Sequence, residues 1–269
     1  MTIKQYFLFL CLIIVAFFNN AGIINTVSDA NFQAATAADS FFTTDSNTVQ
    51  HFSGFSSNTS VSGNSDTNTA WTVNGTDTTT SESVTCGDTK TVTTRTFDGT
   101  SGNNMTNNTS YILGNGFGSF TIEFIFKPDV QNNQDQLYSN RQLASPNTGH
   151  LGYYNASNQF YALTRNSSNA VIMDAARSSM ASVVGAWTHI VVRYDDETTL
   201  RVAYQINGLV TSTAISGSGN TAMTEDATVT DNMVANPLAN FMFGSGSIST
   251  WGGFDGKIAE MRISNIARY

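Results

Sequence analysis

The amino-acid sequence predicts an all-β fold, an antiparallel β-sandwich. Short segments rich in Val, Ile, Thr, Tyr and Phe recur along the chain, and turn residues such as Asn and Gly separate them at regular spacing. Charged residues make up only 12% of the 269 residues, so uncharged polar side chains must cover much of the surface. Helical periodicity is confined to one short stretch near residues 174–184, which ends at Gly185. These three observations favour strands over helices.

The individual strands are clearest in the second half of the chain. Residues 119–126 place Ile122, Phe124 and Phe126 on one face, as the two-residue period of a strand requires. Residues 149–165 predict a hairpin whose two strands flank an Asn-Ala-Ser-Asn turn. Further strands are predicted at residues 187–195, 200–210, 239–246 and 254–264.

Residues 1–30 are interpreted as an N-terminal leader. Lys4 precedes a wholly apolar run over residues 6–18, which Asn19 ends. The run is shorter than the roughly 20 residues that a membrane-spanning helix needs. It therefore predicts a secretory signal peptide, with a retained hydrophobic anchor as the alternative. Either interpretation places the protein outside the cell, secreted or at the cell surface.

Residues 31–90 form a Thr/Ser/Asn-rich extension with few large apolar side chains. Thr-rich runs favour extended backbone, so this segment is predicted to be either a stalk or a set of extra strands on the following domain, residues 91–269. Once the leader is removed, Cys86 is the only cysteine. It is either a buried small hydrophobe or a thiol that links two molecules.

Six segments together resemble the laminin-G-like jelly rolls of the concanavalin A-like lectin/glucanase superfamily, and they occur in that family's order. They are TFDGT (96–100), SFTIEFIFKPD (119–129), GAWTHIVVRYD (185–195), YQINGLV (204–210), PLANFMFGSG (237–246) and FDGKIAEMRISNIAR (254–268). The sequence departs from the family at Ile125, where a Trp is common. The resemblance implies a jelly-roll β-sandwich, but the superfamily includes lectins, glycosidases, adhesion modules and structural domains.

An enzymatic activity is not expected. Glycoside hydrolysis requires two carboxylates that flank the scissile bond, and the hydrolases that the chain resembles carry Glu at alternate strand positions with an Asp between them. The sequence has no E-x-D-x-E motif, and Glu123 and Glu260 resemble structural residues of non-catalytic relatives. The three histidines, His51, His150 and His189, occur in unrelated contexts and indicate neither a catalytic triad nor a zinc site.

Charge excludes one class of partner. Twelve Lys and Arg against twenty Asp and Glu give a net charge of −8. Nucleic-acid binding depends on a basic face that neutralises phosphates, so no nucleic-acid partner is expected.

Calcium is the one cofactor that the resemblance suggests. It points to Asp98 and Asp255, where the first and last strands of the domain meet, and carboxylate oxygens are calcium ligands. The alternative is that each Asp starts a tight turn by accepting a hydrogen bond from its own backbone, since a Gly follows each of them.

Sugar recognition would require aromatic rings that stack on the C–H faces of a sugar, beside amide or hydroxyl groups. Loop residues are therefore the candidates for ligand contact. They are Trp251 in a Gly/Ser loop, Tyr153 and Tyr154 beside the hairpin turn, and Tyr138, Asn140 and Arg141 in a polar segment. For Trp251, packing beneath its own loop is the alternative.

The sequence thus predicts a non-catalytic extracellular module that recognises glycans or a cell-surface protein. The alternative is a structural subunit of a filament, surface layer or virion, which self-assembles into a homopolymer through its N-terminal segment. A divergent glycosidase is a third, disfavoured hypothesis. A binding module predicts a monomer whose glycan binding is lost in Trp251→Ala, whereas an assembly subunit predicts large particles.

Overall fold

The computed structural model describes residues 40–53, 71–75, 78–100, 102–107, 119–132, 134–139, 149–165, 171–177, 180–195, 199–211, 224–226, 242–244 and 252–269. The chain divides into two compact units, residues 1–40 and 41–269. The predicted leader lies outside the described residues. Within them, no helix is long and apolar enough to span a membrane.

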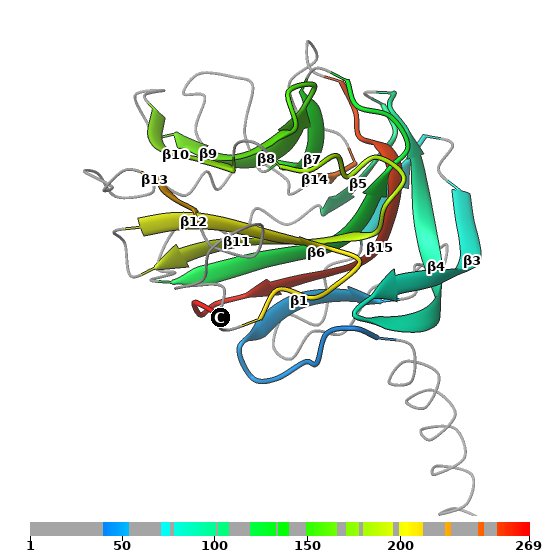
Figure 1. The fold of residues 1–269 in the computed structure, drawn as a ribbon, viewed down its shortest axis with the longest axis horizontal. Helices are drawn as coiled ribbons and strands as arrows, with labels where there is room; N and C mark the ends of the chain where they lie inside the picture. The colour runs from blue at the N-terminus through cyan, green and yellow to red at the C-terminus, as the bar shows by residue number, and fades with distance from the viewer. Residues whose placement is uncertain are drawn as a thin grey trace, which may run out of the picture. The chain divides into compact units, whose positions relative to one another are not determined.

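Two antiparallel sheets form two stacked layers (Figure 1). The eight-stranded sheet has the order β13 (Thr224–Asp226), β12 (Thr199–Ile206), β11 (Thr188–Asp195), β6 (Phe120–Pro128), β15 (Asp255–Ser264), β4 (Asp88–Asp98) and β3 (Thr78–Cys86), and β1 (Thr48–Ser53) also pairs with β15. The seven-stranded sheet has the order β10 (Val171–Arg177), β9 (Gln159–Arg165), β8 (Gly149–Asn155), β7 (Asp135–Ser139), β14 (Met242–Phe243), β5 (Asn104–Asn107) and β2 (Trp71–Asn74).

The predicted all-β fold class is therefore confirmed. The predicted hairpin at residues 149–165 forms β8 and β9, and Asn158 in its turn has a left-handed backbone with φ of 55°. The helix-like stretch near residues 174–184 was a wrong expectation. Its first part belongs to β10, because the backbone of that segment pairs with β9.

The main core lies between the two sheets. Strand β6 contributes Phe120, Ile122, Phe124 and Phe126, which are fully buried, as their alternation predicted. Across the layer, the ring of Phe124 stacks on Tyr138 of β7 with 5.6 Å between ring centroids. Contacts of this kind between large apolar side chains hold the two sheets together.

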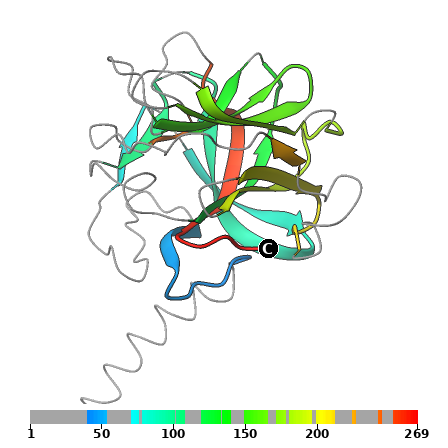
Figure 2. The ribbon, with the colours of Figure 1, turned by 90° about the vertical axis from the view of Figure 1, so that its left-hand side faces the viewer.

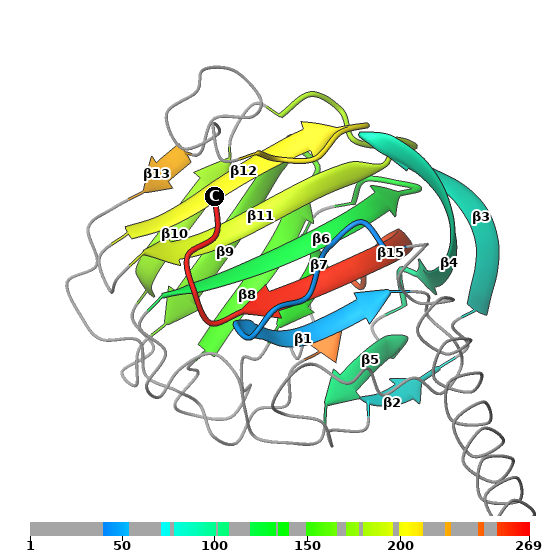
Figure 3. The same cartoon turned by 90° about the horizontal axis from the view of Figure 1, so that it is seen from below.

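The other face of β6 is buried as well, because further segments cover the outer face of the eight-stranded sheet. These covering segments are residues 41–47 ahead of β1, the β3–β4 hairpin and residues 265–269 (Figures 2 and 3). They enclose a second apolar cluster made of Phe42, Val84, Cys86, Val92, Ile125, Trp187 and Ala259. Strands from the Thr/Ser-rich extension thus belong to both sheets and to this cover.

Candidate functional site

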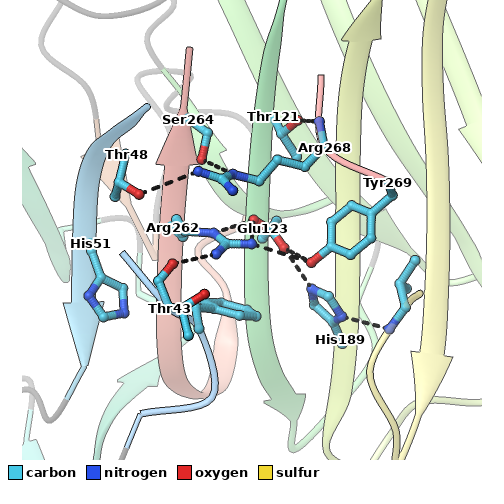
Figure 4. A network of polar contacts seen from close by, with 12 residues as sticks. Thr43, Thr48, His51, Thr121, Glu123, His189, Arg262, Ser264, Arg268 and Tyr269 are labelled. Atoms are coloured by element: carbon cyan, nitrogen blue, oxygen red, sulfur yellow. Dashed lines mark hydrogen bonds and ion pairs between the residues drawn. The ribbon is translucent and has the colours of Figure 1, made fainter. Parts of the chain in front are cut away.

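Glu123 lies at the centre of a polar network on the covered face of the eight-stranded sheet (Figure 4). Its Oε2 accepts a hydrogen bond from Arg262 Nε at 2.6 Å, and its Oε1 accepts one from the hydroxyl of Tyr269. The Nε2 atom of His189 lies 3.4 Å from Oε1. Burial alone would raise the pKa of Glu123, but the contacts with His189 and Arg262 outweigh it and lower the pKa to about 2.

The contacts of His189 determine which of its two ring nitrogens carries a proton. Its Nδ1 accepts a hydrogen bond from the backbone N–H of Val210 at 2.9 Å, so the proton of the neutral ring sits on Nε2, which faces Glu123. His189 is thus a buried residue of β11 whose two ring nitrogens both face groups of its own chain.

Glu260 anchors the segment ahead of β1. Its two carboxylate oxygens accept hydrogen bonds from the backbone N–H groups of Phe41 and Phe42, at 2.6 and 2.9 Å. His51 Nε2 lies 2.7 Å from the same carboxylate. A register shift in β15 between Ile258 and Glu260 turns Glu260 toward the covering segment, because plain alternation from the core residue Ile258 would point it inward.

Two arginines complete the attachment of the covering segment. Arg262 donates a hydrogen bond to the carbonyl oxygen of Thr43 at 2.7 Å, and Arg268 donates one to Asp45 Oδ1 at 2.6 Å. The hydrogen bond from Arg268 is the main reason that the pKa of Asp45 falls to about 2. Both Glu123 and Glu260 are thus buried and satisfied by groups of their own chain, which leaves neither carboxylate open to a substrate.

The opposite, outer face of the seven-stranded sheet has a different character. Phe160 and Ala162 of β9 point into the core, so Tyr161 between them lies on the outer face, where it is half-buried. The Tyr161 hydroxyl donates a hydrogen bond to Gln159 Oε1 at 3.0 Å, and Asn155 Nδ2 donates to the same oxygen at 3.0 Å. An aromatic ring and two amides therefore lie side by side at the β8–β9 hairpin.

Gln136 of β7 lies in the same cross-strand row. Its backbone is opposite Tyr153, which is in turn opposite Tyr161, so Gln136 and Tyr161 are two strands, or about 10 Å, apart. Its side chain is fully buried, and neither amide atom has a hydrogen-bond partner within the described part of the chain. We call Asn155, Gln159 and Tyr161 the tyrosine–amide patch.

The structure corrects two of the predicted ligand contacts. Tyr138 and Tyr154 belong to the core between the sheets, where 0% and 1% of their surfaces are exposed. Tyr138 stacks on Phe124, and the Tyr154 hydroxyl donates a hydrogen bond to Asn158 Oδ1 at 2.8 Å. Neither ring is available to a ligand, because strand alternation turns both inward.

Of the remaining predicted ligand residues, the structure describes only Tyr153. Tyr153 lies on β8 at the register position between Gln136 and Tyr161. Trp251, Asn140 and Arg141 lie outside the described residues. Sequence reasoning missed Tyr161 and Gln159, although counting alternate positions from the predicted hairpin turn would have placed Tyr161 opposite Tyr153.

Asp98 and Asp255 are brought together as the resemblance suggested, since their Cα atoms are register partners on β4 and β15. Asp98 Oδ1 accepts a hydrogen bond from the backbone N–H of Thr100 at 2.9 Å, which is the turn role that the alternative gave it. Burial, and then the charges of Asp129 and Asp98, raise the pKa of Asp255. No group of three His, Cys, Asp or Glu residues that could hold a metal occurs in the described part of the chain.

Cys86 is completely buried in the second apolar cluster. Its thiol donates a hydrogen bond to the carbonyl oxygen of Gly208 at 2.9 Å, and burial raises its pKa to about 12. The hypothesis of an intermolecular thiol is therefore corrected. Only the thiolate forms disulfides readily, and the folded protein neither exposes nor ionises this group.

The superfamily of concanavalin A-like lectins and glucanases has a sequence profile that matches residues 97–269. The chain belongs to this superfamily. The match begins at the end of β4, so β1, β2, β3 and most of β4 precede the part shared with the family. No curated protein matches the sequence.

The chain is similar to several solved structures at low sequence identity. The receptor-binding domain of a botulinum neurotoxin C/D mosaic serotype has a TM-score of 0.55 and 9% identity, over 83% of this chain and 49% of that one. Domain 4 of AbnA, an extracellular arabinanase from Geobacillus stearothermophilus solved with arabinotriose, has a TM-score of 0.48 and 13% identity, over 74% and 82%. NanB sialidase from Streptococcus pneumoniae has a TM-score of 0.41 and 15% identity, over 56% and 23%.

Proposed function

We propose that this protein is a non-catalytic, extracellular binding module that recognises neutral glycans through the tyrosine–amide patch. The observation that supports it is the half-buried ring of Tyr161 beside the amides of Gln159 and Asn155. Such a ring offers a stacking surface for sugar C–H groups, and amides supply both donors and acceptors for hydroxyls. The patch carries no charge, which suits a neutral ligand.

Membership of a superfamily with many lectins, together with the predicted leader, supports extracellular glycan recognition.

The non-catalytic part of the proposal rests on Glu123 and Glu260. A glycosidase needs a proton-donating acid, and the low pKa of Glu123 keeps it ionised above about pH 2. Both carboxylates also lie beneath a covering segment. We expect purified protein to release no sugar from any polysaccharide that it binds.

A glycan array followed by titration calorimetry tests the binding proposal. We expect Tyr161→Ala and Gln159→Ala to weaken binding at least tenfold, while Tyr161→Phe, which keeps the ring, retains part of it. Val184→Ala, an exposed apolar position outside the patch, serves as the matched control. An array without signal, or full binding by Tyr161→Ala, would disprove glycan recognition here, and cell binding that resists glycosidase treatment would indicate a protein partner instead.

We also propose that Asp98 and Asp255 contribute oxygens to a calcium ion. The like charges that raise the pKa of Asp255 would be compensated by a cation, and calcium accepts carboxylate and backbone oxygens together. Calcium should then raise the melting temperature, EDTA should lower it, and Asp255→Asn should abolish both effects. An identical melting temperature with calcium and with EDTA contradicts this proposal.

A further inference from the structure

Strand β3 ends the eight-stranded sheet with an open edge. Its nine residues pair with β4 without any register shift, and its other edge pairs with no strand in the described part of the chain. The side chains of residues 78–81 are all exposed. Because successive side chains of a strand point to opposite faces, both faces of β3 are exposed over this stretch.

The other four edge strands in the described part of the chain, β13, β2, β10 and β1, are shorter than β3, and β1, with six residues, has a register shift between Thr48 and Gln50. Strand β13 has three residues, two of them acidic, and β2 has four. Strand β10 has seven, with a register shift between Val171 and Met173. Proteins usually block edge strands with charge, proline, bulges or short length, and β3 has no proline and no bulge.

The one charge on β3 is neutralised within the chain. The Glu82 carboxylate lies 2.8 Å from Lys257 Nζ and 3.5 Å from Lys127 Nζ, and it accepts a hydrogen bond from the Thr94 hydroxyl at 2.6 Å. A chain with a net charge of −8 repels its own copies on average, but this edge presents only Thr and Ser. Electrostatics therefore permit two copies to meet here.

We infer that the free edge of β3 pairs with the same edge of a second copy of this chain. A two-fold axis would set the two strands antiparallel, with Thr80 opposite Thr80 of the other copy and Thr79 opposite Ser81. Main-chain hydrogen bonds provide the affinity in such strand addition, and cross-strand Thr pairs add to it. The exposed side chains of residues 78–81 are all uncharged Thr and Ser, which suits pairing with an identical strand.

The pairing is reversible and joins two sheets into one. A single strand edge buries less than the roughly 1,200 Å² of a standard stable interface, so the dimer should form only at high concentration. Each dimer would carry two tyrosine–amide patches. The edge lies on the other sheet from the patch, so the two proposals stand or fall separately.

Sedimentation velocity from about 1 µM to about 1 mM, followed by charge-swapped variants, tests the inference. We expect the wild type to shift from monomer to dimer over this range. Thr79→Lys/Ser81→Lys and Thr79→Glu/Ser81→Glu should each remain monomeric, because each brings like charges together across the axis. An equimolar mixture of the two variants should dimerise, which loss of folding could not produce.

The matched control places the same charges elsewhere. Ala181→Lys/Ser182→Lys alters two exposed positions away from β3 and should dimerise like the wild type. A wild type that stays monomeric up to the highest concentration overturns the inference. So does a dimer that persists in either charged variant, or a mixture of the two variants that stays monomeric.

Discussion

The outer faces of the two sheets differ in what lies against them. On the eight-stranded sheet, three segments from distant parts of the sequence cover an apolar cluster and an ion-pair network around Glu123. On the seven-stranded sheet, the ring of Tyr161 is half-buried beside the amides of Asn155 and Gln159, which share one hydrogen bond. The first face resembles a protein interior and serves stability, whereas the second has the chemistry of a binding surface.

This difference shows that titratable residues alone do not mark a functional site. The covered face holds carboxylates, histidines and arginines, the residue types of an active site, yet each is bound to a partner from the same chain. The tyrosine–amide patch on the outer face of the seven-stranded sheet is made of uncharged residues, which are easily overlooked in a sequence. The following predictions test the comparison, beginning with the largest expected effect.

Replacing Glu123 with Gln should destabilise the protein most. The change leaves the buried Arg262 without its counter-charge, and breaking a buried ion pair from one side costs about 3–5 kcal/mol. Urea unfolding measures the loss. Glu82→Gln, in a pair that is partly open to solvent, is the control and should cost about 1 kcal/mol or less. Equal losses in the two variants would mean that the covered face does not behave as an interior.

Phe42→Ala should loosen the covering segment. The ring is buried, 5.2 Å from the ring of His189, and the Arg262 guanidinium lies 4.9 Å from its centre. Removing a buried Phe side chain costs about 3 kcal/mol, less if the segment readjusts. Hydrogen exchange should then accelerate at Phe41 and Phe42, whose N–H groups bond to Glu260. Unchanged exchange would show that the backbone bonds alone hold this segment.

Acid should weaken the covered face. Glu123 and Asp45 each have a folded-state pKa of about 2, below the ordinary values of 4.5 and 3.8. A lowered pKa contributes stability above the ordinary value, and that contribution is lost as pH falls toward 2. The urea midpoint should therefore drop between about pH 5 and pH 2. The double variant Asp45→Asn/Glu123→Gln should show a flatter dependence, and an unchanged slope would contradict these assignments.

Tyr161→Ala should have the smallest effect on stability and the largest on binding. The side chain is half-buried on the outer face of the seven-stranded sheet, so we expect a change of about 1 kcal/mol or less in the free energy of unfolding. Glycan affinity should fall at least tenfold in the same variant. A large stability loss without a change in binding would assign Tyr161 to packing and would remove the contrast between the two faces.

Local patterns predicted the strands well because strand alternation depends only on neighbouring residues. The apolar positions of β6 and the turn after Asn155 could be read directly from the sequence. The same alternation was not applied to Tyr153 and Tyr154, although adjacent strand residues cannot both face a ligand. In β15, alternation itself fails, since the register shift after Ile258 reverses which side chains face the core.

By itself, the sequence determined the all-β fold class, the superfamily and the absence of a basic surface, because composition, local periodicity and a series of short motifs are sufficient for each. Only the tertiary structure decided that distant segments cover the outer face of the eight-stranded sheet and that Tyr161 lies half-buried on the outer face of the other sheet. The Phe41 N–H and the Glu260 carboxylate that bind one another are 219 positions apart in the chain, and no local pattern encodes such a contact. Burial depends on what packs against a residue, so the role of each carboxylate and tyrosine became visible only in the folded chain.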